Sequence, residues 1–244
     1  IVPFQTALVI GGFFLSMLLS LYWLAPVFIF GTAVMVWRWT ATTGTTEDDG
    51  PVDTGQGDRL PTSFAVRGSV GYWGSVLAIA ASATLFASLV FGHFFLWVVA
   101  PNWPPPGDFG AYLLEPALVT AGALLALAAA RIGACDFARS RNGAMISACG
   151  LALAIACLLI GAIRHLPGPG EHSFAAVGWT LASYAVFSAI VGLLAQVFIT
   201  RRIASGHTTS DRPHELRFVA VWGDYGAAVA LAVAWILSLS SASL

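Results

Sequence analysis

The sequence has no lysine and few charged residues of either sign. Charged residues make up 9% of its 244 positions, whereas a soluble domain carries about 25%. So low a share excludes a chain whose whole surface faces water. The formal net charge is −1. A surface without a basic excess has no electrostatic attraction for phosphates, so no nucleic acid is expected as a partner.

The sequence also lacks the residue patterns that hold metals, cofactors or nucleophiles. Its three cysteines form no C-x-x-C pair, so neither a disulfide nor a sulfur-based metal site is expected. There is no P-loop, no dinucleotide fingerprint and no nucleophile motif. Heme and copper sites in membranes use several histidines on facing helices, but only one of the five histidines, His93, lies within an apolar run. We therefore expect no catalytic, cofactor-binding or metal-binding residue on this chain.

Long apolar runs dominate what is present, since 58% of the residues are hydrophobic. A membrane-spanning helix needs about 20 such residues. The runs cover residues 4–21, 23–39, 69–99, 111–131, 143–163, 173–200 and 217–239. This pattern predicts an all-α fold, a polytopic transmembrane bundle of about seven helices.

The first two runs are separated only by residues 22–26. One helix over 1–39 would be about 58 Å long, against a hydrocarbon core of about 30 Å. A two-helix hairpin over 1–40 is therefore predicted. It is followed by a polar linker over 41–68, flexible between residues 43 and 58, and by a five-helix bundle over 69–244.

Arginines gather on one side of this topology. Ten of the eleven fall near the ends of the helices at residues 38–68, 131–142 and 201–217, and only Arg164 lies on the other side. The positive-inside rule makes the arginine-rich side cytoplasmic. Segments 40–68, 132–142 and 201–216 are then cytoplasmic loops, and the C-terminus lies on the periplasmic side.

Three ionisable residues lie inside apolar runs, where such groups are functional candidates by default. His93 is either a proton relay or ligand, or a neutral imidazole bonded to a neighbouring helix. Glu115 is either functional or an interfacial carboxylate favoured by a helix N-terminus. Asp224 is either functional or paired with a cytoplasmic arginine such as Arg217.

Small residues recur along the run at 69–99 and are a candidate helix-packing stripe. Small residues four apart allow two helix backbones to approach closely. We expect the stripe to face another helix of this chain or a partner subunit, with no lipid covering it. Its members are Gly74, Ala78, Ser82, Ser88 and Gly92.

Three segments resemble cytochrome c oxidase subunit III, a member of the heme-copper oxidase complexes. They are residues 71–74 (GYWG), 82–91 (SATLFASLVF) and 100–107 (APNWPPPG), of which the last is the most specific. The resemblance covers residues 64–240. It is strongest to bacterial forms in which subunit III is fused behind subunit I.

The resemblance implies seven helices divided by a lipid-filled cleft into two and five. It implies a non-catalytic subunit of an aerobic respiratory, proton-translocating complex in the bacterial inner membrane. This subunit would pack against subunit I, alongside subunit II, and support stability and proton uptake. Hemes and copper would lie on partner subunits, and phospholipid would bind to this chain. Three positions depart from the family pattern, namely Ala83 in place of a glutamate and Ser188 and Gly223 in place of histidines.

Three other functions stay open at this point. The chain fits an accessory subunit of a quinol oxidase or of a nitric oxide reductase. A proton-coupled transporter would use His93, Glu115 and Asp224, although their different depths argue against one midplane site. A membrane-anchoring protein without defined activity is the third alternative.

Overall fold

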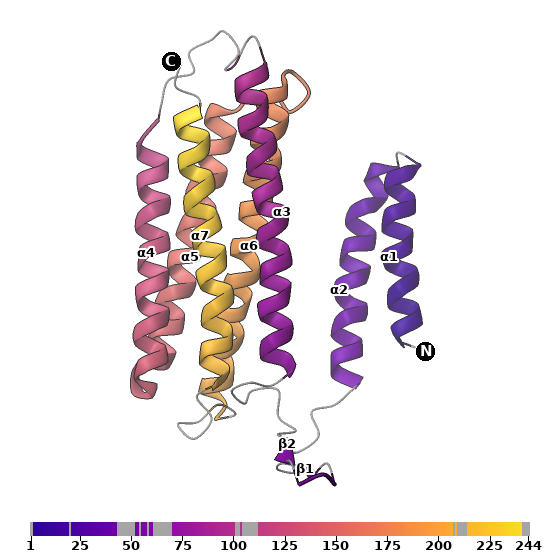
Figure 1. Cartoon of the computed structure of the whole chain (residues 1–244), viewed down its shortest axis with the longest axis vertical. Coiled ribbons are helices and arrows are strands. Elements are labelled where there is room, and N and C mark those ends of the chain that lie inside the picture. Colours follow the sequence, from indigo (N-terminus) through magenta and orange to yellow (C-terminus); the bar gives the residue numbers. More distant parts are fainter. Residues whose placement is uncertain are drawn as a thin grey trace. The chain divides into compact units, whose positions relative to one another are not determined.

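The computed structural model describes residues 2–19, 21–42, 52–53, 55–57, 59–60, 70–100, 103, 112–206, 208 and 214–240. In these residues the chain is almost entirely helical, as the all-α prediction requires (Figure 1). Backbone contacts divide it into residues 1–62, here called the hairpin unit, and residues 63–244, the five-helix unit. The division falls within the predicted linker.

The hairpin unit contains α1 (Val2–Leu18) and α2 (Ala25–Thr42), joined by a 3₁₀ turn over Tyr22–Leu24. Two helices in place of one long helix confirm the predicted hairpin. The two helices pack closely at their glycines. A Cβ at Gly31 would lie 3.2 Å from the side chain of Val9, and one at Gly12 would collide with the ring of Phe28.

The predicted flexible linker contains a short β-ladder. Two strands, β1 (Val52–Asp53) and β2 (Arg59–Leu60), pair antiparallel. Gly55 and Gly57 take φ angles of 76° and 87° between them, a backbone region that glycine adopts at little cost. The flexibility predicted for residues 43–58 stays a prediction; of this segment the structure describes residues 52–53 and 55–57, where the turn glycines reverse the chain locally.

The five-helix unit contains α3 (Val70–Val99), α4 (Leu114–Cys135), α5 (Phe137–His165), α6 (Ser173–Ala204) and α7 (His214–Ser240). All five are long and apolar enough to cross a membrane, whereas the apolar helices of the hairpin unit are shorter. Successive helices run in opposite directions. One end of the unit, here called the arginine-rich end, collects the starts of α5 and α7 and the ends of α4 and α6.

The segment 132–142, which was predicted to be a loop, is almost entirely helical. α4 continues to Cys135 and α5 begins at Phe137, so Asp136 alone connects them. The Asp136 carboxylate accepts a hydrogen bond of 3.0 Å from the Ala138 amide and caps α5. Arg139 and Arg141 consequently lie in the first turns of α5. Charged residues are tolerated at such positions near the end of an apolar helix.

The core lies among α4, α5, α6 and α7, and α3 contacts only α6 and α7. Small residues bring α4 and α5 together. A Cβ at Gly122 would lie 2.7 Å from the Gly150 carbonyl oxygen, and one at Gly150 would lie 2.5 Å from the Gly122 oxygen. Such close approach is how membrane helices gain contact area without a hydrophobic driving force.

Candidate functional site

Glu115 anchors a cluster of polar side chains at the end opposite the arginine-rich end. It is the second residue of α4 and is buried, with 8% of its surface exposed. Its Oε1 accepts from the Arg164 guanidinium at 3.4 Å and lies 3.3 Å from His165 Nε2, both at the end of α5. The expected position at a helix N-terminus is thus present, together with two partners that the sequence did not suggest.

Tyr112 completes this cluster. Its ring stacks on His165 with centroids 3.8 Å apart and planes 7° apart. Burial and the nearby Glu115 carboxylate raise the pKa of Tyr112 to about 12. The phenol therefore stays neutral at neutral pH, and Glu115 and Arg164 bring opposite charges to the cluster.

This cluster accounts for the one arginine outside the topological pattern. Arg164 is the arginine expected on the periplasmic side, and its charge is balanced by Glu115. A neutralised arginine contributes little to a charge asymmetry across a membrane.

A small pocket beside the cluster has room for about one water molecule. Its lining residues are Tyr112, Glu115, Pro116, Val119, Cys157, Leu158, Gly161, Ala162, Ala234 and Leu237.

Asp224 of α7 pairs with Arg131 of α4, near the arginine-rich end. Arg131 Nε donates to Asp224 Oδ2 at 3.1 Å, and the terminal nitrogen Nη2 contacts the same oxygen. The expected kind of partner, an arginine of this side, is present, but it is Arg131 and not Arg217. Arg217 is exposed on α7 and lies seven positions, about 10 Å along the helix, before Asp224.

His93 is fully buried, and neither ring nitrogen has a hydrogen-bond partner among the described residues. Its ring packs edge-on against Trp103 with centroids 5.2 Å apart. The indole Nε1 of Trp103 is likewise buried and unpaired within the described part of the chain. The expected hydrogen bond from His93 to a neighbouring helix is therefore replaced by an aromatic contact.

The packing stripe on α3 divides into one residue that contacts α6 and others that do not. Ser82 Oγ lies 2.7 Å from the Tyr184 hydroxyl of α6. Gly74, Ala78 and Ser88 are exposed, and a Cβ at Gly74 or Gly92 would meet nothing within 4 Å. Among the described residues of the five-helix unit, a facing helix is present for Ser82. A partner subunit facing the remainder stays a prediction.

Three hydroxyl groups join α3, α6 and α7 in the apolar interior. Tyr184 Oη donates to the Ser82 carbonyl oxygen at 2.6 Å and lies 2.7 Å from the Tyr225 hydroxyl. The Phe86 ring stacks on Tyr184 with centroids 5.8 Å apart. Sequence inspection missed both tyrosines, since neutral hydroxyls do not stand out in an apolar run.

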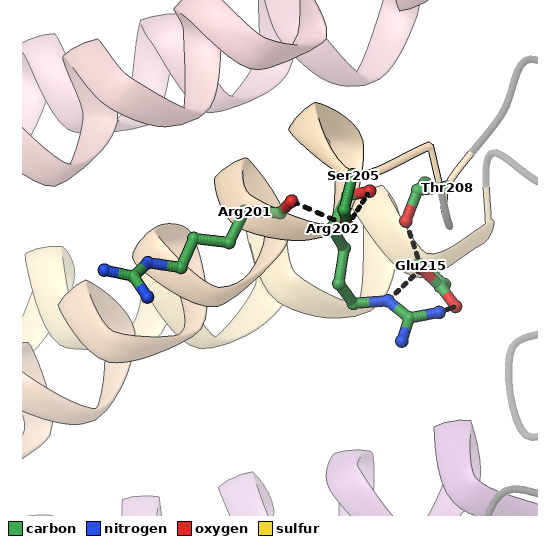
Figure 2. A network of polar contacts seen from close by, with 5 residues as sticks. All are labelled: Arg201, Arg202, Ser205, Thr208 and Glu215. Atoms are coloured by element: carbon green, nitrogen blue, oxygen red, sulfur yellow. Dashed lines mark hydrogen bonds and ion pairs between the residues drawn. The ribbon is translucent and has the colours of Figure 1, made fainter.

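An ionic network ties α6 to α7 at the arginine-rich end (Figure 2). Arg202 donates through two nitrogens to the two carboxylate oxygens of Glu215, at 3.0 and 2.7 Å. The Thr208 hydroxyl donates to the same carboxylate. In Figure 2 the neighbouring Arg201 side chain points away from this network. The bidentate Arg202–Glu215 pair thus joins the end of α6 to the start of α7, in a geometry that arginine favours.

The departures from the subunit III pattern lie on three helices, α3, α6 and α7. Ala83 is exposed on α3, and the Ser188 hydroxyl donates to the Tyr184 carbonyl oxygen at 2.9 Å within α6. A Cβ at Gly223 would lie 2.7 Å from Gln196 Nε2. Glycine at 223 thus leaves room for the Gln196 amide, which the sequence analysis did not single out.

The described residues include no group of three or more His, Cys, Asp or Glu side chains placed to hold a metal ion. Two acidic residues lie well inside apolar runs, and each is ion-paired: Glu115 with Arg164 near the start of α4, and Asp224 with Arg131 near its end. Glu115 and Arg131 are sixteen residues apart, about 24 Å along the helix. Such an arrangement stabilises a bundle and contains no convergent set of reactive groups.

No protein-family model matches the chain, and a sequence search of curated proteins finds no match.

Proposed function

We propose that this chain is a non-catalytic subunit III, or a subunit III-like domain, of an aerobic respiratory cytochrome c oxidase. The observation that carries the proposal is the division into a two-helix hairpin unit and a five-helix unit. This is the division that the resemblance over residues 64–240 implies. In this proposal the hemes and copper lie on subunits I and II, and this chain carries none.

The arrangement of polar groups supports a scaffold over a transporter. A proton-coupled transporter needs titratable groups that converge on one site. Glu115 and Asp224 are instead held by Arg164 and Arg131 at the two ends of the five-helix unit. Ion pairs of this kind connect helices and leave no shared site for a transported proton.

The exposed side of α3 supports a protein partner. Gly74 and Ala78 are exposed, and within the five-helix unit a Cβ at Gly74 would meet nothing within 4 Å. Small residues facing lipid forfeit contact area, whereas facing a helix they allow close approach. In the proposed complex this side of α3 packs against subunit I, phospholipid covers other apolar faces, and the arginine-rich end faces the cytoplasm of a bacterial cell.

Co-purification tests the proposal. The full chain, tagged and expressed in a heme-copper oxidase-producing bacterium, is purified in mild detergent, and reduced-minus-oxidised spectra and metal content are measured. We expect heme absorbance, iron and copper to accompany the chain. After the subunits are separated, the isolated chain is expected to hold none of them. Purification of the folded chain without any heme would overturn the proposal.

A further inference from the structure

Three buried polar atoms without hydrogen-bond partners among the described residues lie on three helices of the five-helix unit. They are Ser147 Oγ on α5, Gln196 Nε2 on α6 and Asp224 Oδ1 on α7. Ser147 and Gln196 are 1% and 2% exposed. Leaving a buried polar group unpaired costs about 1–3 kcal/mol, so three together in one bundle need a physical explanation.

Packing contacts place the three groups at one level of the bundle. Leu151 of α5 lies 3.4 Å from where a Gly192 Cβ would be on α6. Ser147 lies one turn before Leu151 and Gln196 one turn after Gly192. Because α5 and α6 run antiparallel, both are one turn nearer the arginine-rich end. The Gln196 amide then reaches α7 at Gly223, next to Asp224.

Apolar side chains lie on both sides of this level among the described residues. One apolar cluster on the side of the arginine-rich end contains Ala144, Ile199, Leu216 and Val219. A second cluster on the other side contains Ala123, Ala126, Leu151, Ala189 and Ala227. The polar level therefore lies between two apolar clusters and borders the surface only beside Asp224, and water is the ligand whose hydrogen-bonding chemistry matches its polar groups.

The chemistry of the three groups is complementary around a water molecule. An amide nitrogen donates, a carboxylate oxygen accepts and a hydroxyl does either. Asp224 keeps its charge compensated because its other oxygen binds Arg131. The Arg131 side chain is 70% exposed and that of Asp224 is 18% exposed, so the pair joins the polar level to the surface.

We propose that Ser147, Gln196 and Asp224 form an internal water-binding site within α4–α7, connected to the arginine-rich end beside the Arg131–Asp224 pair. Water at this site accepts from the Gln196 amide, donates to Asp224 Oδ1 and shares a hydrogen bond with Ser147. Gly223 makes the site possible, because any Cβ there would displace the Gln196 amide. The inference stands on α4–α7 alone and does not depend on the proposed function.

Hydroxyl-radical labelling of the full chain, read by mass spectrometry, tests this inference, because radicals formed from bound water modify adjacent buried side chains. We expect labelling of Leu151 and Ile199, which are 0% and 1% exposed, at least several-fold above Leu181, an equally buried residue of α6. Labelling of Leu151 and Ile199 at the level of Leu181 would overturn the site.

Two variants test which residues hold the water. Gln196→Leu and Ser147→Ala are each expected to reduce labelling of Leu151 and Ile199 to the level of Leu181. Ser188→Ala removes a buried hydroxyl that is already paired, and it is expected to leave the labelling unchanged. Ser147→Ala removes a single oxygen and so keeps the test valid if Gln196→Leu fails to fold. Undiminished labelling in Ser147→Ala would refute the assignment of the three groups.

Discussion

The most apolar 18-residue stretches of α3 and α6 have equal mean hydropathy but very different surroundings. In the most apolar 18-residue stretch of α3 no residue is buried, whereas 39% of the corresponding stretch of α6 is buried. α6 packs between α5 and α7, and α3 contacts only α6 and α7 along one side. Hydropathy therefore identifies a helix that enters a membrane, and packing alone decides whether lipid or protein surrounds it.

The two helices also differ in how they use small residues. The stripe on α3 leaves Gly74 with open space, whereas on α6 a Cβ at Gly192 would lie 3.0 Å from the Trp222 carbonyl oxygen of α7. The same residue type is thus a contact surface in the core and an uncovered surface on α3. In the proposed complex, a partner subunit covers this surface of α3.

The largest effect is expected from valine at a core glycine. Gly122→Val places side-chain atoms against the Gly150 carbonyl of α5, where even a Cβ would lie 2.7 Å away, and should lower the free energy of unfolding by about 3 kcal/mol. Gly74→Val, on the exposed side of α3, is the control and should stay within about 0.5 kcal/mol. Unfolding in mixed detergents measures both, and equal losses would remove the distinction between the two helices.

A smaller effect is expected at the connection between α6 and α7. Arg202→Ala removes two hydrogen bonds to the partly buried Glu215 carboxylate. We expect a loss of about 1–2 kcal/mol and faster proteolysis of this connection. Arg201→Ala removes a neighbouring arginine whose side chain is exposed and should change stability by less than about 0.5 kcal/mol. Matching proteolysis rates in the two variants would contradict the network in Figure 2.

The smallest effect concerns the attachment of α3 to the core. Tyr184→Phe removes the hydroxyl that contacts both Ser82 and Tyr225 and should cost about 1 kcal/mol. Tyr225→Phe removes one contact of the same cluster and should cost less. Hydrogen exchange of the α3 amides, followed by mass spectrometry, should accelerate more in Tyr184→Phe. The reverse order would mean that the hydroxyls do not hold α3 in place.

The sequence predicted the helices well because apolar length is a property of each run by itself. Five spanning helices and the hairpin at residues 22–24 follow from run length, and only the β-ladder and the one-residue connection at Asp136 departed from it. Side-chain partners depend on the rotation and register of neighbouring helices, which periodicity does not specify. In the structure Asp224 therefore pairs with Arg131, where Arg217 was predicted, and Glu115 pairs with Arg164, for which no partner was predicted.

Some signals of the polar groups were nevertheless present in the sequence. Tyr184, Ser188 and Gln196 repeat at four-residue steps on α6, with Gly192 between them, and this spacing places them on one face. Arg164 is the one arginine expected at its end of the bundle, and Glu115 is the acidic residue inside an apolar run nearest that end. Charge balance therefore made Glu115 a candidate partner of Arg164.

The central claim is that a protein partner covers the small-residue side of α3, and two alanines of this helix test it most directly. Ala78 and Ala87 are both exposed and lie nine residues apart, which places them about two and a half turns apart, on opposite sides of the helix. The measurement is the heme absorbance retained per tagged chain after purification of Ala78→Leu and Ala87→Leu. The account predicts loss of heme with Ala78→Leu and full retention with Ala87→Leu, with unchanged stability of the separated chains. Equal retention of heme in both variants would contradict it.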